Sequence, residues 1–150
     1  EDQFHFFREV HRVLRPGGRF VLTTPNVLSL TSRVRTLLSG FPELFGPLPI
    51  HGYDPQHVGG HIHPVSVYYI SYMAEKAGFR VIGCTTDRVK SGSAALLILW
   101  PLVQLGSAIV AMHARRNIPA IYKENREHLA RMNSFAVLTG RTVIIEMERR

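Results

Sequence analysis

A helix, a tight turn and an apolar strand follow one another within the first 26 residues, and this succession constrains the fold more than any other feature. Apolar side chains recur at helical spacing, with charged side chains between them. These are Phe4, Phe7, Val10 and Leu14. Pro16-Gly17-Gly18 is predicted to end the helix, because proline cannot continue it and glycine accepts a positive φ. A helix that turns directly into an apolar strand is typical of an α/β fold.

The strand that follows is uniformly apolar at Phe20-Val21-Leu22, which predicts a parallel strand covered on both faces. In open parallel sheets, ligands bind just beyond the carboxyl ends of the strands. Thr24, Pro25 and Asn26 are therefore predicted to lie at a binding site. Asn26 also precedes an apolar run, where asparagine commonly caps a helix, so both roles are open for it.

Two segments together resemble a known family. The sequence of residues 12–19, RVLRPGGR, with the apolar strand that ends at Thr24-Pro25-Asn26, is similar to class I S-adenosylmethionine-dependent methyltransferases of the type 11 group. The later segments 61–66 and 74–81 resemble the next helix and strand of that family. The two matches cover about half of the chain.

The resemblance implies a Rossmann-like class I methyltransferase sheet, of which the chain holds the C-terminal half. It implies the strand order 5-7-6, in which residues 142–148 form an antiparallel last strand between strands at 20–22 and 79–86. The family's Gly-rich turn and the acidic residue after its second strand are not found, and Gly17-Gly18 is a turn. Residues 1–150 are therefore expected to be a partial methyltransferase domain. Most of its cofactor motif would lie upstream, and the fragment is expected to be inactive alone.

The function implied by the resemblance is methyl transfer from S-adenosylmethionine to a small or lipid-linked acceptor, with oxygen as the expected target. Thr24, Pro25 and Asn26 are the cofactor-binding candidates. Arg33, Tyr53 and His57 are the candidates for the acceptor side. The alternative is a non-catalytic, membrane-associated or scaffold domain derived from a methyltransferase.

Residues 41–64 are rich in proline and glycine, which excludes long regular elements, but they also carry apolar side chains. This combination predicts an ordered lid over the substrate side. Histidine is the commonest general base, so His61 or His63 is predicted to deprotonate or orient the acceptor. His63 has an alternative role as the cap of a helix that starts at Pro64. A His61-x-His63 metal site lacks a third ligand at recognisable spacing, so no metal is predicted.

An apolar insert at residues 91–116 precedes the last strand, and Ser91 to Ala114 contains no charged side chain. Its length would admit a membrane-spanning helix. A single crossing would leave strands 79–86 and 142–148 on opposite sides of the bilayer, so the insert is expected to return, to lie on the membrane surface or to be buried in protein. Pro101 and Gly106 are the candidate bends.

Peripheral membrane contact is expected through residues 94–112, since basic residues flank them and could meet anionic headgroups. These are Lys90, Arg115, Arg116 and Lys123. The alternative is a core or dimer-interface helix.

The chain carries 18 basic and 11 acidic residues, for a net charge of +7. The basic residues are scattered and are not interleaved with aromatic ones, so nucleic acid is not an expected partner. Cys84 is the single cysteine, which is consistent with a reducing compartment. A cytoplasmic protein, peripheral on the inner face of the membrane, is the expectation, and the oligomeric state is left open.

Overall fold

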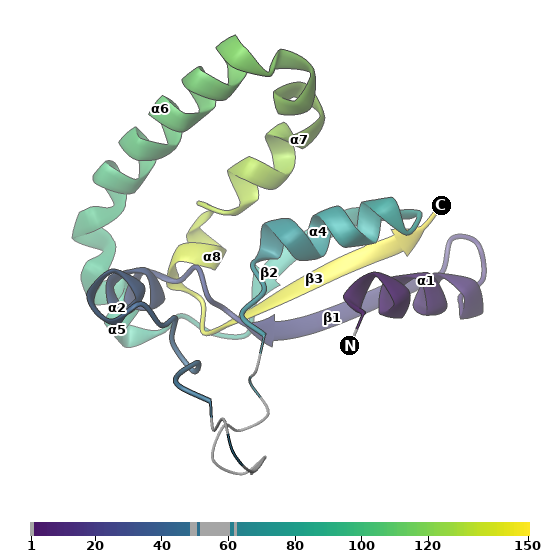
Figure 1. The fold of residues 1–150 in the computed structure, drawn as a ribbon, viewed down its shortest axis with the longest axis horizontal. Coiled ribbons are helices and arrows are strands. Elements are labelled where there is room, and N and C mark those ends of the chain that lie inside the picture. Colours follow the sequence, from purple (N-terminus) through teal and green to yellow (C-terminus); the bar gives the residue numbers. More distant parts are fainter. Residues whose placement is uncertain (1, 49–50, 52–60, 62) are drawn as a thin grey trace.

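The computed structural model describes residues 2–48, 51, 61 and 63–150, which form an α/β fold on a three-stranded sheet (Figure 1). The strands are β1 (Arg19–Pro25), β2 (Phe79–Thr86) and β3 (Thr142–Arg149). Their order is β1-β3-β2, and β3 is antiparallel to both neighbours. The expected insertion of the last strand between the other two is confirmed.

Helices precede, follow and connect these strands. The helix α1 (Gln3–Val13) precedes β1, α2 (Leu30–Ser39) follows it, and α4 (Val67–Lys76) leads into β2. Between β2 and β3 lie α5 (Ser91–Ala95), the 3-10 helix η1 (Leu96–Leu99), α6 (Trp100–Asn117), α7 (Pro119–Arg131) and α8 (Phe135–Thr139). The helices α6 and α7 form a hairpin that projects beyond the end of the sheet near α2 and α5 (Figure 1).

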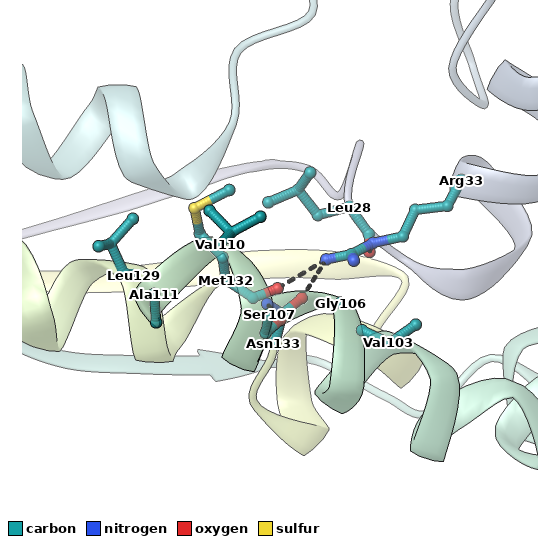
Figure 2. Close-up of a pocket in the computed structure, with 10 residues that line it drawn as sticks. All are labelled: Leu28, Arg33, Val103, Gly106, Ser107, Val110, Ala111, Leu129, Met132 and Asn133. Atoms are coloured by element: carbon teal, nitrogen blue, oxygen red, sulfur yellow. Dashed lines mark hydrogen bonds between the residues drawn. The ribbon is translucent and has the colours of Figure 1, made fainter. Parts of the chain in front are cut away.

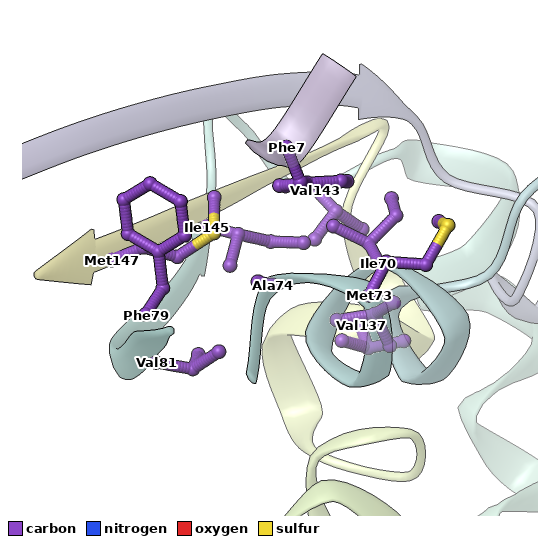
Figure 3. Close-up of a cluster of buried hydrophobic side chains, with 11 residues drawn as sticks. Phe7, Ile70, Met73, Ala74, Phe79, Val81, Val137, Val143, Ile145 and Met147 are labelled. Carbon is purple, nitrogen blue, oxygen red and sulfur yellow. The ribbon is translucent and has the colours of Figure 1, made fainter. Parts of the chain in front are cut away.

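The hydrophobic core lies between one face of the sheet and the helices α1 and α4 (Figure 3). Buried and partly exposed side chains alternate along β3, and the buried ones are Val143, Ile145 and Met147. On the opposite face, Glu146 pairs with Arg19 of β1 and Glu148 with Arg80 of β2. Because a strand points successive side chains to opposite faces, this alternation gives the sheet one apolar and one largely polar face.

The expectation that β1 is covered on both faces is wrong for the part of the chain that the structure describes. Phe20 and Leu22 pack against the core, but Val21 between them is 56% exposed. The apolar run in this strand therefore does not mean that helices cover both of its faces, because α1 and α4 both pack on one side of the sheet.

The helix expected from Pro64 begins instead at Val67, and Ser66 in extended conformation precedes it. Its buried face is formed by Val67, Ile70 and Ala74 at helical spacing, whereas Tyr69 and Tyr72 are 62% and 40% exposed. A tyrosine hydroxyl stays hydrated when its side chain points to solvent. The helix therefore buries its aliphatic side chains and exposes Tyr69 and Tyr72. The predicted stop at Gly78 is confirmed by its φ of 98°.

The apolar insert does not bend at Pro101 or Gly106. Pro101 lies in the first turn of α6, where its missing N–H needs no partner, and the helix continues through Gly106 to Asn117. The chain reverses at Ile118, and α7 then returns to the sheet. A return of the insert to its starting side is one of the three arrangements expected from the sequence, and it allows β2 and β3 to pair.

The predicted helix after β1 is confirmed as α2, which ends at Gly40 with a φ of 75°. Its stripe is only partly packed: Leu30 is buried, but Leu37 and Leu38 are 84% and 80% exposed. Of the predicted lid, residues 41–48, 51, 61, 63 and 64 are described and contain no helix or strand.

Candidate functional site

A cavity of about 320 Å³ opens at the carboxyl end of β1, where the sequence places the site. We call it the strand-end cavity. Its polar rim and its apolar floor come from α1, β1, the segment before α4 and α4 itself. The rim residues are Asp2, Gln3, Thr23, Thr24 and His63; the floor residues are Phe6, Phe7, Leu22, Val65, Ile70 and Met73. A polar rim over an apolar floor is typical of a small-molecule site.

Two of the predicted site residues, Thr24 and His63, meet in this cavity although 39 positions separate them. Thr24 is held by the β1–β3 ladder opposite Val143. His63 is exposed and lies in the extended segment that leads to α4. The cavity thus places a hydroxyl-bearing residue and an imidazole around one volume.

Asp2 adds a carboxylate to the rim. Its pKa is lowered, chiefly by a backbone hydrogen bond from His5, with the nearby Arg8 guanidinium acting in the same direction. The carboxylate is therefore ionised at neutral pH and gives the rim a negative group beside His63.

Asp2, Gln3 and Thr23 line the cavity but were not predicted from the sequence to do so. For Asp2 and Gln3, the lengths of the predicted helix and strand could have indicated this position. The 11-residue helix α1 rises about 16 Å and the seven-residue β1 about 23 Å, so a tight turn brings the start of α1 back toward the end of β1. Thr23 carries no comparable signal in the sequence.

Asn26 is a structural brace. It is 6% exposed, and its Nδ2 donates to the backbone oxygens of Val137 at 2.6 Å and Gly140 at 2.8 Å. Its Oδ1 accepts from the Leu28 N–H at 3.0 Å. Its expected role as a helix cap is wrong, because Ser29 caps α2 by accepting from the Ser32 N–H. Both N–H groups of the Asn26 amide are therefore occupied by bonds within the fold. Pro25 ends β1 and does not line the strand-end cavity.

His61 lies apart from His63. Its ring meets Phe45 edge-on at a centroid distance of 5.8 Å, and it faces the segment 40–48 rather than the strand-end cavity. Tyr53 and His57 lie outside the described residues. Within the described ranges, no group of three His, Cys, Asp or Glu side chains is placed to hold a metal.

The beginning of the predicted lid is fixed to the insert. Glu43 forms an ion pair with Lys90 and accepts a hydrogen bond from Thr31 Oγ1 at 2.9 Å. Burial works to raise the pKa of Glu43, but Lys90 and Thr31 outweigh it, and the net direction is downward. Ser93 Oγ of α5 lies 3.1 Å from the same Thr31 hydroxyl. This network joins α2, the start of the lid and α5.

Arg33, predicted on the acceptor side, lines a second and larger cavity of about 520 Å³ between α2, α6 and α7, which we call the helix-hairpin cavity (Figure 2). Its Nε donates to the Leu28 oxygen at 2.8 Å, and its Nη2 donates to the Met132 oxygen at 2.9 Å and to Asn133 Oδ1 at 2.8 Å. The structure thus divides the predicted site residues between two cavities.

No protein-family model matches the chain, and no curated protein is similar to it. The functional assignment accordingly rests on the residues and their geometry.

Proposed function

We propose that this chain is the C-terminal part of a Rossmann-like, S-adenosylmethionine-dependent methyltransferase that acts on a small or lipid-linked acceptor, at oxygen. The observation that carries the proposal is the convergence of Thr24 and His63 on one cavity at the carboxyl end of β1. The strand order, with an antiparallel strand between two others, also supports it.

The strand-end cavity fits part of the cofactor. Its volume is at the lower end of the range for small-molecule sites, and Thr24, on the core side of β1, contributes a polar side chain to its lining. When bound, the cofactor supplies an electrophilic methyl group. Thr24 would hold it from this side, and the remaining contacts would come from outside this chain.

His63 is the proposed general base, and its ring nitrogen would accept the hydroxyl proton of the acceptor as the oxygen is methylated. Asp2 on the same rim would stabilise the resulting imidazolium. The division of the histidines between cavities favours His63 over His61 for this proposed role.

Calorimetry with S-adenosylhomocysteine on the full-length protein tests the cofactor site, and micromolar binding is expected. Substituting His63→Ala should lower the rate of methyl transfer by about 100-fold or more with little change in cofactor affinity, because a general base contributes about that much. His61→Ala is the matched comparison and should have a small effect. Absence of cofactor binding would remove the enzyme proposal.

Membrane contact through residues 94–112 is part of the proposal, with the protein cytoplasmic and peripheral on the inner membrane face. The stretch Ser91–Asn117 is long and apolar enough to cross a membrane by length and composition alone, and its most apolar 18-residue window contains no buried residue. Core burial within the chain therefore does not account for its apolarity. Basic Arg115 and Arg116 at its end suit anionic headgroups.

A second candidate is a non-catalytic, membrane-associated domain derived from a methyltransferase. It is favoured by the use of Asn26 and Arg33 as structural hydrogen-bond donors, which occupies two predicted ligand contacts. Liposome binding without S-adenosylhomocysteine binding would support this candidate over the enzyme.

A further inference from the structure

The helix-hairpin cavity has a polar end and apolar walls (Figure 2). The walls come from the segment after β1 and from the facing sides of α6 and α7. They are formed by Leu28, Val103, Val110, Ala111, Leu129 and Met132. At the polar end, Asn133 accepts from Arg33, donates to Ser107 Oγ and receives a bond from Gln104 Nε2 at its backbone oxygen. This end is therefore positioned by contacts from three helices and their connections.

Arg33 is a partly buried cation whose recorded partners are all neutral: two backbone oxygens and the Asn133 amide oxygen. Within the described residues, no carboxylate forms an ion pair with it, and its Nη1 carries no hydrogen bond. Burial lowers the pKa of this guanidinium, yet arginine remains charged in proteins. A desolvated charge beside an apolar cavity is stabilised by an anionic partner.

The opposite side of α6, continued by η1, is also apolar. Ile98, Leu102, Leu105, Ile109 and Met112 recur at spacings of four and three residues, and each is at least half exposed. We call these five residues the outer stripe. A helix that lines a cavity with one side and exposes an apolar stripe on another can stand between a bilayer and that cavity.

We propose that the helix-hairpin cavity binds a single-chain amphiphile, with its apolar chain between α6 and α7 and its anionic head at Arg33. This site is separate from the strand-end cavity, and the inference does not depend on the proposed function. A fatty carboxylate and an alkyl phosphate share the required chemistry, so the test includes both.

Gly106 offers a way to close the cavity without damaging the helix. It lines the cavity on α6, and a side chain added there would meet no atom within 4 Å. A Gly106→Phe substitution should therefore fill space that a ligand would occupy. Ala108→Phe is the matched control, since Ala108 is an exposed α6 residue that does not line the cavity.

Calorimetry on the full-length protein would compare dodecanoate, dodecyl phosphate and dodecanol, each below its micelle concentration. We expect one or both anionic probes to bind about tenfold or more tightly than dodecanol, because hydrogen bonds between charged groups are stronger than those to a neutral hydroxyl. Gly106→Phe should weaken that binding at least as much, and Ala108→Phe should leave it unchanged. Arg33→Gln should remove the preference for the charged probes.

Equal affinity of the wild-type protein for dodecanol and for the anionic probes would overturn the inference, as would unchanged binding in Gly106→Phe. S-adenosylhomocysteine would be titrated in the same samples. Cofactor binding without amphiphile binding overturns the inference alone. Amphiphile binding without cofactor binding supports the cavity assignment and overturns the enzyme proposal.

Discussion

Two polar side chains, Asn26 and Ser29, hold the segment between β1 and α2 in place. Asn26, at the end of β1, donates two hydrogen bonds to α8, one to Val137 within the helix and one to Gly140 directly after it. Both partners lie more than 100 residues away in the sequence. Ser29, three positions later, performs the helix capping that was one of the two roles open for Asn26. The segment between strand and helix is therefore fixed by two different polar side chains with separate tasks.

Replacing Asn26 with alanine should destabilise the protein by about 2–4 kcal/mol, because it leaves the Val137 and Gly140 oxygens without their donor in a buried place. Urea denaturation measures this change. Asn117→Ala is the control: Asn117 is exposed and donates only to the His113 oxygen of its own helix. Its cost should stay below about 0.5 kcal/mol. Similar losses in both variants would contradict the role of Asn26 as a brace.

His128 on α7 should make stability sensitive to mild acid. Burial and the adjacent Arg131 lower its pKa, and together they outweigh the attraction of Glu75 and Glu127. In the unfolded chain the pKa returns to about 6.5, so the unfolded state binds the proton first as the pH falls. The stabilisation is present above pH 6.5 and is lost as the pH falls through the lower folded-state value. Unfolding free energies at pH 7.5 and 5.5 measure this slope, which His128→Gln should reduce.

Among the elements, α6 departs most from the usual behaviour of a helix in a globular chain. It is apolar along most of its length and has no buried residue, and its contacts are chiefly with α7 and η1. The chain bends at Ile118, where proline at the start of α7 favours a new helix. The hairpin therefore returns the chain to β3 while leaving the outer stripe uncovered.

The outer stripe should be needed for binding to anionic vesicles. Changing Leu105 and Ile109 together to serine should lower co-sedimentation with such vesicles by at least about tenfold, because each residue loses most of its apolar area. Thermal stability should hardly change, since both side chains are exposed. Val13→Ser on α1 is the control, with an equally exposed apolar side chain far along the sheet. Wild-type protein that ignores anionic vesicles would refute membrane contact.

At the scale of the whole molecule, the sheet has one packed and one open face. The helices α1 and α4 cover the side of Ile145, whereas the side of Ile144 carries the cross-strand ion pairs. Neighbouring isoleucines on one strand therefore sit in contrasting surroundings.

Ile145→Ala should cost about 2–5 kcal/mol and Ile144→Ala about 1 kcal/mol or less, because only the first change opens a cavity in a packed core. Denaturant unfolding of the two variants gives the comparison directly. An equal cost at both positions would mean that the Ile144 face is also packed, and it would contradict the one-sided sheet.

The sequence by itself determined the kinds of elements and many of their limits. The helix before Pro16, the strand from Phe79 to Thr86 and the stops at Gly40 and Gly78 follow from periodicity and backbone preferences, which act between residues close in sequence. The resemblance supplied the strand order. Thr24 was placed at the site by its position at a strand end.

Only the tertiary structure decided which faces are covered and which polar groups are free. Val21 is exposed because α1 and α4 pack on the other face of the sheet, and Asn26 is engaged by partners more than 100 residues away. Arg33 and His63 line different cavities because α7 and α1 close different spaces. Such contacts depend on how distant segments pack, and a local pattern along the chain does not encode that packing by itself.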